Sequence, residues 1–209
     1  MISVEHKFLF IGIQKTACSS ILTALQPYYE KECFWIVNRD GEGDIINRIC
    51  PKLEKHSTLS MYKEVLDKDL YDSLYKFCSV RNPWERTISY YFYAMKMPGN
   101  YKITPKSKEW DRTLFIELFY KYFAPHTVRY YTNTSIDNPI ASEMNYIIRY
   151  ENLREDFKKA TKELDIKTRA LPWVNKSKHD NYRKYYDSEL ELLIYNTFKE
   201  EADFFGYAF

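Results

Sequence analysis

A lysine flanked by small and hydroxyl-bearing residues follows the first apolar run of this chain. Residues 7–20 read KFLFIGIQKTACSS, in which Lys15 follows Gly12 after two residues. Glycine permits a tight turn, and the backbone N–H groups that open a following helix carry the positive end of its dipole. The hydroxyls that join them are those of Thr16, Ser19 and Ser20. With the ammonium group of Lys15, these donors are typical of a loop that binds a compact oxyanion with several charges.

This loop differs from the nucleotide-binding P-loop GxxxxGK[ST], because the second glycine is absent and the lysine comes too early. No apolar run ends in an aspartate that could bind Mg²⁺: FCSVR (77–81) ends in arginine, and YIIRYE (146–151) offers only Glu151. Phosphoryl transfer from ATP needs that metal, so a Mg²⁺-dependent small-molecule or nucleotide kinase with a degenerate P-loop is a less favoured interpretation. A capped helix start with a surface lysine is the structural alternative.

A second segment, SVRNPWERTIS (79–89), also carries phosphate-binding chemistry. Arg81 comes where the expected strand 75–80 ends, and Pro83 suits the first turn of the helix that follows. The planar guanidinium of Arg81 matches a phosphate group, and the Ser89 hydroxyl adds a donor. An Arg-Asn-Pro turn with a structural role is the alternative. Two such turns at one sheet edge favour a ligand with two separated anionic groups, such as a nucleotide phosphorylated at both the 3′ and 5′ positions.

Strands and helices are expected to alternate along the chain. Apolar runs rich in β-forming residues predict strands at 7–13, 34–37, 75–80 and 145–150. Helical spacing and capping residues predict helices at 19–26, 57–66, 82–95, 107–123, 151–165 and 188–204. This order predicts an α/β fold, with a mostly parallel sheet and helices on both faces, in a single domain over residues 1–209. In such sheets, ligands bind beyond the carboxyl ends of the strands.

Aromatic residues make up 18% of the chain and crowd residues 90–131. Aromatic side chains at helical spacing usually pack in a core, which is the simpler interpretation of this segment. The alternative is a wall against which a ring-shaped acceptor stacks.

The composition limits the class of protein. Apolar residues make up 45% and charged residues 29% of the 209 residues, as in globular domains. The net charge of +2 argues against a nucleic-acid-binding domain, which is usually strongly basic. The four cysteines form no CxxC pair, no signal-peptide pattern is visible, and no window approaches the ~18 apolar residues of a membrane span. We therefore expect a cytoplasmic location, no metal site, no nucleic-acid partner and no membrane span.

Both anion-binding segments resemble motifs of the sulfotransferases that use 3′-phosphoadenosine 5′-phosphosulfate (PAPS). IGIQKTACSS resembles the family's 5′-phosphosulfate loop, P-K-[TS]-[GA]-[TS]-[TS], and departs from it at Gln14 and Cys18. VRNPWERTIS is similar to the 3′-phosphate motif, R-N-P-x-x-R-x-x-S. IIRYENLREDF resembles a strand-to-helix segment of the family, and FFGY (204–207) resembles a C-terminal element of its carbohydrate-type branch. The likeness runs from about residue 7 to residue 207.

This resemblance implies a P-loop-like fold, PAPS as the sulfuryl donor without a metal, and a small-molecule or carbohydrate acceptor. It implies that the 5′-phosphosulfate is held by Lys15, Thr16, Ala17, Cys18, Ser19 and Ser20. It also implies that Arg81 and Ser89 hold the 3′-phosphate and that Tyr150 lies near the adenine. Ser177 belongs to the segment WVNKSKHDNY, which resembles a basic loop that closes over the nucleotide.

Sulfuryl transfer needs a positive group at the leaving phosphate and a base for the acceptor hydroxyl. Lys15 is the candidate for the first role. Histidine suits the second, and His56 resembles the catalytic histidine of several carbohydrate sulfotransferases in its position before a helix. His6 is expected at the opposite sheet edge and His179 in the closing loop. The other candidate bases are His126, Glu54 and Glu64.

A function of another class stays open beside the enzyme. A non-catalytic module could bind the same bisphosphate nucleotide for regulation or assembly. Lys15 and His56 argue against it, because binding alone requires no base.

Overall fold

The computed structural model describes residues 1–28, 33–37, 43–47, 53–105, 107, 109–132, 143–167, 170–172 and 179–209. These residues form two compact units. The sheet unit comprises Met1–Val80 and Val128–Asn175, and the helical unit comprises Arg81–Thr127 and Lys176–Phe209.

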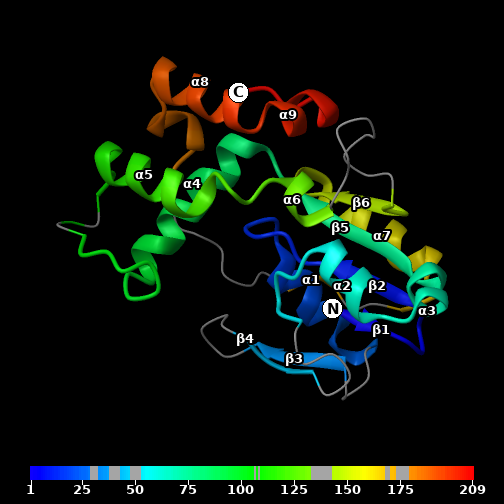
Figure 1. The fold of residues 1–209 in the computed structure, drawn as a ribbon. Helices are drawn as coiled ribbons and strands as arrows, with labels where there is room; N and C mark the ends of the chain where they lie inside the picture. Colours follow the sequence, from blue (N-terminus) through cyan, green and yellow to red (C-terminus); the bar gives the residue numbers. More distant parts are fainter. Residues whose placement is uncertain are drawn as a thin grey trace. The chain divides into compact units, whose positions relative to one another are not determined.

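A four-stranded sheet in the order β1-β2-β5-β6 is the centre of the sheet unit (Figure 1). Its strands are β1 (Ile2–Ser3), β2 (Phe8–Ile11), β5 (Tyr75–Val80) and β6 (Tyr146–Arg149). The short β1 pairs antiparallel with β2, whereas β2, β5 and β6 run parallel to one another. The carboxyl ends of these three strands therefore lie at one edge of the sheet, where ligands bind in open α/β folds.

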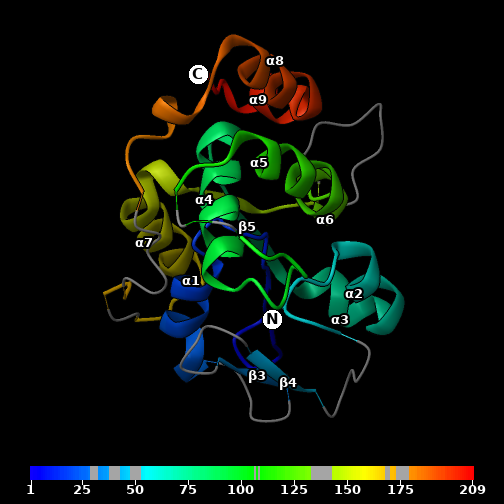
Figure 2. The ribbon, with the colours of Figure 1, turned by 90° about the vertical axis from the view of Figure 1, so that its left-hand side faces the viewer.

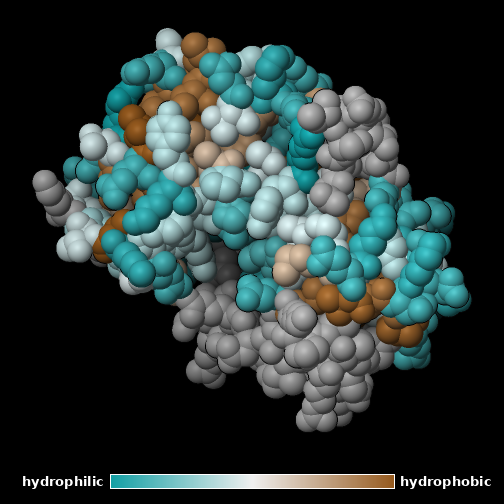
Figure 3. Space-filling model, in the orientation of Figure 1, coloured by the Kyte–Doolittle hydropathy of each residue, from teal (hydrophilic) through white to brown (hydrophobic). Residues whose placement is uncertain are grey.

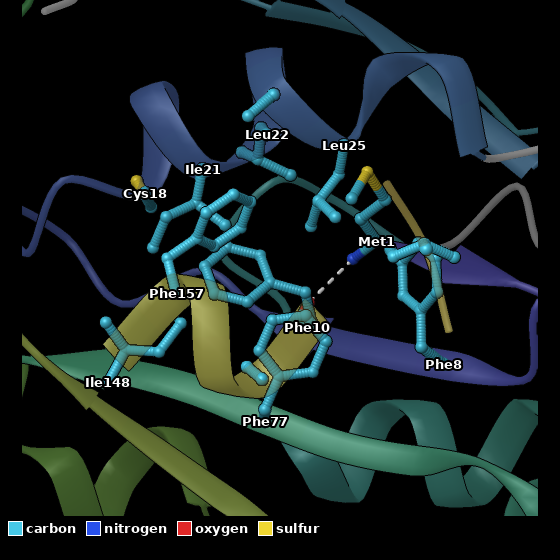
Figure 4. Close-up of a cluster of buried hydrophobic side chains, with 13 residues drawn as sticks. Met1, Phe8, Phe10, Cys18, Ile21, Leu22, Leu25, Phe77, Ile148 and Phe157 are labelled. Carbon is cyan, nitrogen blue, oxygen red and sulfur yellow. Dashed lines mark hydrogen bonds between the residues drawn. The ribbon is translucent and has the colours of Figure 1, made fainter. Parts of the chain in front are cut away.

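Helices cover both faces of this sheet. On one face, α1 (Cys18–Leu25) and α7 (Leu153–Glu163) pack against Phe10 and Phe77, as Figure 4 shows. On the other face lies α3 (Lys68–Ser73), whose Tyr71 ring centroid is 4.5 Å from the Lys76 ammonium nitrogen. The remaining helices of this unit are α2 (Leu59–Val65), α6 (Val128–Thr132), η1 (Gln26–Tyr28) and η3 (Tyr150–Asn152). Burial on both faces explains the uninterrupted apolar sequence of β2.

A second, two-stranded sheet pairs β3 (Cys33–Val37) antiparallel with β4 (Gly43–Asn47). The strand predicted at 34–37 is thus confirmed, but its partner β4 was not predicted. The four-stranded sheet and this two-stranded sheet are separate.

The helical unit is built around α4 (Pro83–Lys96), which packs against α8 (Ser188–Thr197) and η4 (Tyr182–Tyr185). Figure 2 shows α8, with α9 (Lys199–Phe205) after it, next to α4. The predicted helix 107–123 begins later, as α5 (Arg112–Leu118), and continues as a π-helix, η2 (Phe119–Phe123). Aromatic side chains fill the core of this unit, among them Tyr90, Tyr91, Phe115, Phe119 and Phe123. Core packing therefore accounts for much of the aromatic segment.

The α/β fold class, with a P-loop-like, mostly parallel sheet and helices on both of its faces, is confirmed. One domain over residues 1–209 stays a prediction. Hydrophilic side chains dominate the face shown in Figure 3, with a few apolar patches between them. Across the described parts of the chain, every helix is too short or too polar to cross a lipid bilayer.

Candidate functional site

The loop after β2 packs tightly against a turn that lies more than 40 residues later in the chain. A Cβ atom on Gly12 would lie 2.8 Å from the carbonyl oxygen of Lys55, which is closer than real Cβ contacts. Position 12 therefore requires glycine for the close approach of another backbone, in addition to any need for a tight turn.

Two residues of this loop adopt left-handed backbone conformations. The φ angle is 64° at Lys15 and 70° at Ala17. Such conformations cost about 1–3 kcal/mol outside glycine and are concentrated at functional sites. In tight turns they direct successive backbone N–H groups into a concave surface that binds anions.

Thr16 anchors the loop to the neighbouring strand. Its side chain is fully buried, and its Oγ1 donates to the carbonyl oxygen of Ile13 at 2.8 Å. The same hydroxyl lies 2.7 Å from Ser79 Oγ near the end of β5. Because this hydroxyl is engaged within the fold, a direct contact of Thr16 with a ligand would come from its backbone N–H.

Helix α1 begins directly after the loop, and within the described chain no side chain caps it. Its N-cap residue is Ala17, whose carbonyl oxygen accepts from the N–H groups of Ser20 and Ile21. Cys18, at the first helical position, is buried in the core beside Ile21. A helix start without a side-chain cap offers its first N–H groups and its dipole to an anion.

His56 lies on the turn that covers Gly12. Two hydrogen bonds between Glu54 and Ser57 fix this turn, at 2.7 and 3.0 Å. The Nδ1 atom of His56 lies 2.5 Å from the carbonyl oxygen of Gly12. Because a carbonyl oxygen only accepts, Nδ1 carries the proton, and the neutral ring has its lone pair on Nε2. The contact therefore assigns the tautomer in which Nε2 is basic.

Lys55 is a further cation at this loop, and the sequence reasoning missed it. Its Nζ donates to the hydroxyl of Ser19 at 3.0 Å, in the first turn of α1. Its position directly before His56 was the sequence feature that could have identified it. The loop thus combines Lys15 with a second ammonium group contributed by the turn that carries the histidine.

Tyr150 opens η3 immediately after β6 and is partly buried. Since β2 and β6 both run parallel to β5, Tyr150 and Gly12 follow strands that end at the same edge of the sheet. Ser177 lies outside the described residues.

The other candidate bases differ from His56 in their exposure, in their strand end or in the unit to which they belong. His6 precedes β2, at the opposite end of that strand from Gly12, and Glu54 and Glu64 are exposed. His126 and His179 belong to the helical unit, where they stack on Tyr90 and Phe92 respectively. Among the described residues, no group of histidine, cysteine, aspartate and glutamate side chains is arranged to hold a metal ion.

The second predicted turn opens α4 in the helical unit. The side-chain oxygen of Asn82 caps this helix by accepting from the N–H groups of Trp84 and Glu85, at 3.0 and 3.3 Å. Arg81 is 5% exposed, and its Nη2 lies 3.0 Å from Glu85 Oε1. Ser89 is also buried, two turns into the helix. A buried guanidinium at a helix start is suited to binding a phosphate group.

Comparison with known proteins identifies the family of this chain. A model of the Sulfotransferase family matches residues 1–208. An uncharacterized protein of Archaeoglobus fulgidus is 27% identical over 124 residues, which cover 59% of this chain and 95% of that protein. No solved structure gives a significant match. The family match includes the loop after β2, the turn with His56 and the start of α4, and this chain therefore belongs to the sulfotransferase family.

Proposed function

We propose that this protein transfers a sulfuryl group from PAPS to a hydroxyl group of a carbohydrate acceptor. Its family membership supports sulfuryl transfer as the reaction class. The observation that carries the proposal is the 2.5 Å contact of His56 Nδ1 with the carbonyl oxygen of Gly12. It joins a residue able to accept a proton to the loop best suited to bind the phosphosulfate.

The proposal assigns residues to each of the two anionic ends of the donor. At the 5′ end, the start of α1 without a side-chain cap and the left-handed loop present backbone N–H groups, and Lys15 and Lys55 add positive charge. At the 3′ end, we assign Arg81 and Ser89 to the phosphate. Tyr150 is assigned to the adenine, and Ser177 to a closing loop over the nucleotide.

The bound donor supplies the sulfuryl group, whose bond to the bridging oxygen breaks as a bond to the acceptor oxygen forms. Negative charge then builds on the bridging oxygen of the departing phosphate. In this proposal, Lys15 stabilises that charge, because the attraction between a fixed cation and the bridging oxygen grows as the negative charge develops. Backbone N–H groups of Cys18 and Ser19 hold the remaining phosphate oxygens in place.

His56 Nε2 takes the proton from the acceptor hydroxyl. The hydrogen bond from Nδ1 to Gly12 keeps the ring in the tautomer that has the lone pair on Nε2. The same bond stabilises the imidazolium ion that forms, since Nδ1 continues to donate to the carbonyl oxygen.

The carbohydrate acceptor is supported by the likeness of FFGY (204–207) to the carbohydrate-type branch. To test it, the protein is incubated with radiolabelled PAPS and a panel of sugars, phenols and steroids. We expect a labelled sugar product, formed equally well in the presence of EDTA. Turnover that EDTA abolishes and Mg²⁺ restores would instead support a kinase.

A thermal-shift comparison separates binding from catalysis. We expect 3′,5′-bisphosphoadenosine to stabilise the protein more than ATP does. Stabilisation by ATP alone would contradict the assignment of PAPS as the donor. Binding of the bisphosphate without turnover of any acceptor would support a non-catalytic module.

A further inference from the structure

Helix α4 is held to the C-terminal segment 188–209 by polar contacts along its first turns. Asn82 Nδ2 donates to the carbonyl oxygen of Ala208 at 2.9 Å. Trp84 Nε1 donates to the carbonyl oxygen of Glu191 at 3.0 Å. These bonds reach opposite ends of the C-terminal segment, so both α8 and the residues after α9 contact the start of α4.

The central contact is an ion pair between Arg86 and Glu201. Both residues are almost fully buried, at 3% and 2% exposure. Arg86 Nη2 lies 3.2 Å from one carboxylate oxygen of Glu201 and 3.4 Å from the other. The Arg86 guanidinium carbon also lies 4.8 Å from the ring centroid of Phe198, between α8 and α9. The C-terminal segment therefore contacts the guanidinium through Glu201 and Phe198.

A buried ion pair is a poor way to gain stability. Removing two charges from water costs several kcal/mol per ion, and apolar residues of similar volume often replace such a pair without loss. An ion pair does, however, restrict geometry, because its hydrogen bonds can form only when the helix has one particular rotation and one particular axial position. Apolar packing tolerates small shifts along the same surface more easily. The pair is thus better explained by a need to fix α4 than by a need to stabilise it.

Arg86 lies between the two residues that we assign to the 3′-phosphate. It follows Arg81 by five positions and precedes Ser89 by three, on the same helix or its immediate N-terminus. Arg86 itself is engaged with Glu201, and its side chain is 4% exposed. A rotation or axial shift of α4 would therefore move Arg81 and Ser89 together and would disturb the ion pair of Arg86 with Glu201.

We propose that Arg86 and Glu201 are positioning residues for the 3′-phosphate subsite. By fixing α4 against α9, the pair sets the rotation and axial position of the helix start that carries Arg81 and Ser89. This inference rests on the proposed function, because it assumes that these two residues bind a 3′-phosphate. It assigns to α9 a role in nucleotide selection, although α9 supplies no proposed ligand contact.

The test is the preference of the protein for 3′,5′-bisphosphoadenosine over adenosine 5′-monophosphate, measured by isothermal titration calorimetry. Glu201→Gln keeps the side-chain shape and removes the charge. We expect the ratio of its affinities for the bisphosphate and the monophosphate to be at least about tenfold smaller than that of the wild type, a difference that calorimetry resolves readily. Its affinity for the monophosphate, which has no 3′-phosphate, should stay unchanged. The matched control is Glu200→Gln, an exposed neighbour on the same helix, which should keep the wild-type preference.

A second variant covers the case in which Glu201→Gln fails to fold. The double substitution Arg86→Met with Glu201→Leu replaces the pair by apolar side chains and should fold with a melting temperature near that of the wild type. We expect it to lose the preference as well. A folded double variant that keeps the preference would overturn the positioning role while leaving the proposed function intact. A wild-type protein with no preference for the bisphosphate would overturn both.

Discussion

The Nδ1 atom of His56 lies 2.5 Å from the carbonyl oxygen of Gly12, across 44 residues of sequence. The carbonyl group of Lys55 closes over the same glycine, at a distance that excludes a Cβ atom. The backbone approach and the side-chain hydrogen bond therefore depend on each other. Together they fix the histidine ring relative to the anion loop.

His56→Asn should abolish catalysis while leaving the loop intact. The asparagine amide can still donate to the carbonyl oxygen of Gly12, but it offers no base at the position of Nε2. We expect kcat to fall by roughly 10²–10⁴-fold, the usual contribution of a general base. Single-turnover assays with saturating PAPS and acceptor measure this loss.

His56→Ala is the comparison, because it removes both the base and the hydrogen bond. We expect it to lose the same turnover and, in addition, some thermal stability. Affinity for 3′,5′-bisphosphoadenosine should stay close to wild type for His56→Asn. Full activity of either variant would assign the base to another residue, such as Glu54 or His126.

Gly12→Ala should displace the turn that carries His56. The added Cβ would lie 2.8 Å from the carbonyl oxygen of Lys55, so one of the two backbones must move. Overpacking of this kind costs about 1–3 kcal/mol. We expect a lower melting temperature together with a loss of kcat. Gly99→Ala is the control, since nothing lies within 4 Å of its added Cβ, and an equal loss in both variants would contradict this explanation.

Lys55→Met should weaken donor binding. The substitution removes a charge and the hydrogen bond to Ser19 Oγ but keeps an unbranched side chain of similar length. The proposal gives the Lys55 ammonium group a contact with the 5′-phosphosulfate, and hydrogen bonds to charged groups are worth about 1.5–3 kcal/mol, so we expect the KM for PAPS to rise by roughly 10–100-fold. Lys63→Met is the control, because this exposed lysine of α2 pairs with Glu143. An unchanged KM in Lys55→Met would limit Lys55 to a structural role.

Local patterns made part of this site predictable. The strands β2, β5 and β6 were predicted because each is a short, largely apolar run, although β6 at the sheet edge buries only Ile148. The loop after β2 was predicted because its glycine, lysine and hydroxyls lie close together in the sequence. The start of α4 was similarly indicated by Pro83, whereas its Asn82 cap was not predicted. Each of these features depends on residues that are neighbours in the sequence.

Contacts between distant segments were not predictable in the same way. The hydrogen bond of Lys55 to Ser19 spans 36 residues, and that of Thr16 to Ser79 spans 63. No local spacing indicates that the Thr16 hydroxyl forms a hydrogen bond with Ser79 on β5, the strand that pairs with β2. The hairpin partner of β3 was missed because β propensity reflects packing on a neighbour that one sequence does not identify. The late start of α5 follows from its cap, Asp111, which accepts from the N–H group of Leu114.

His126 should make the stability of the protein fall at acid pH. Burial lowers the pKa of His126 below its ordinary value of 6.5, and the positive charge of Arg86 lowers it further. When the pH is below 6.5, the histidine is protonated in the unfolded chain but stays neutral in the folded chain. The free energy of unfolding therefore decreases as the pH falls below 6.5. The stabilising contribution is therefore fully present at neutral pH and is lost on acidification.

Urea denaturation at about pH 7.5 and about pH 5.5 measures this effect, because the two values bracket the ordinary histidine pKa. The wild type should lose more stability between them than His126→Gln, which has no titrating group at this position. His179→Gln serves as the matched control, since it removes a second histidine of the same unit, which stacks on Phe92. If His126→Gln kept the full acid sensitivity of the wild type, the loss would have to come from other groups, and the buried neutral state assigned to His126 beside Arg86 would be wrong.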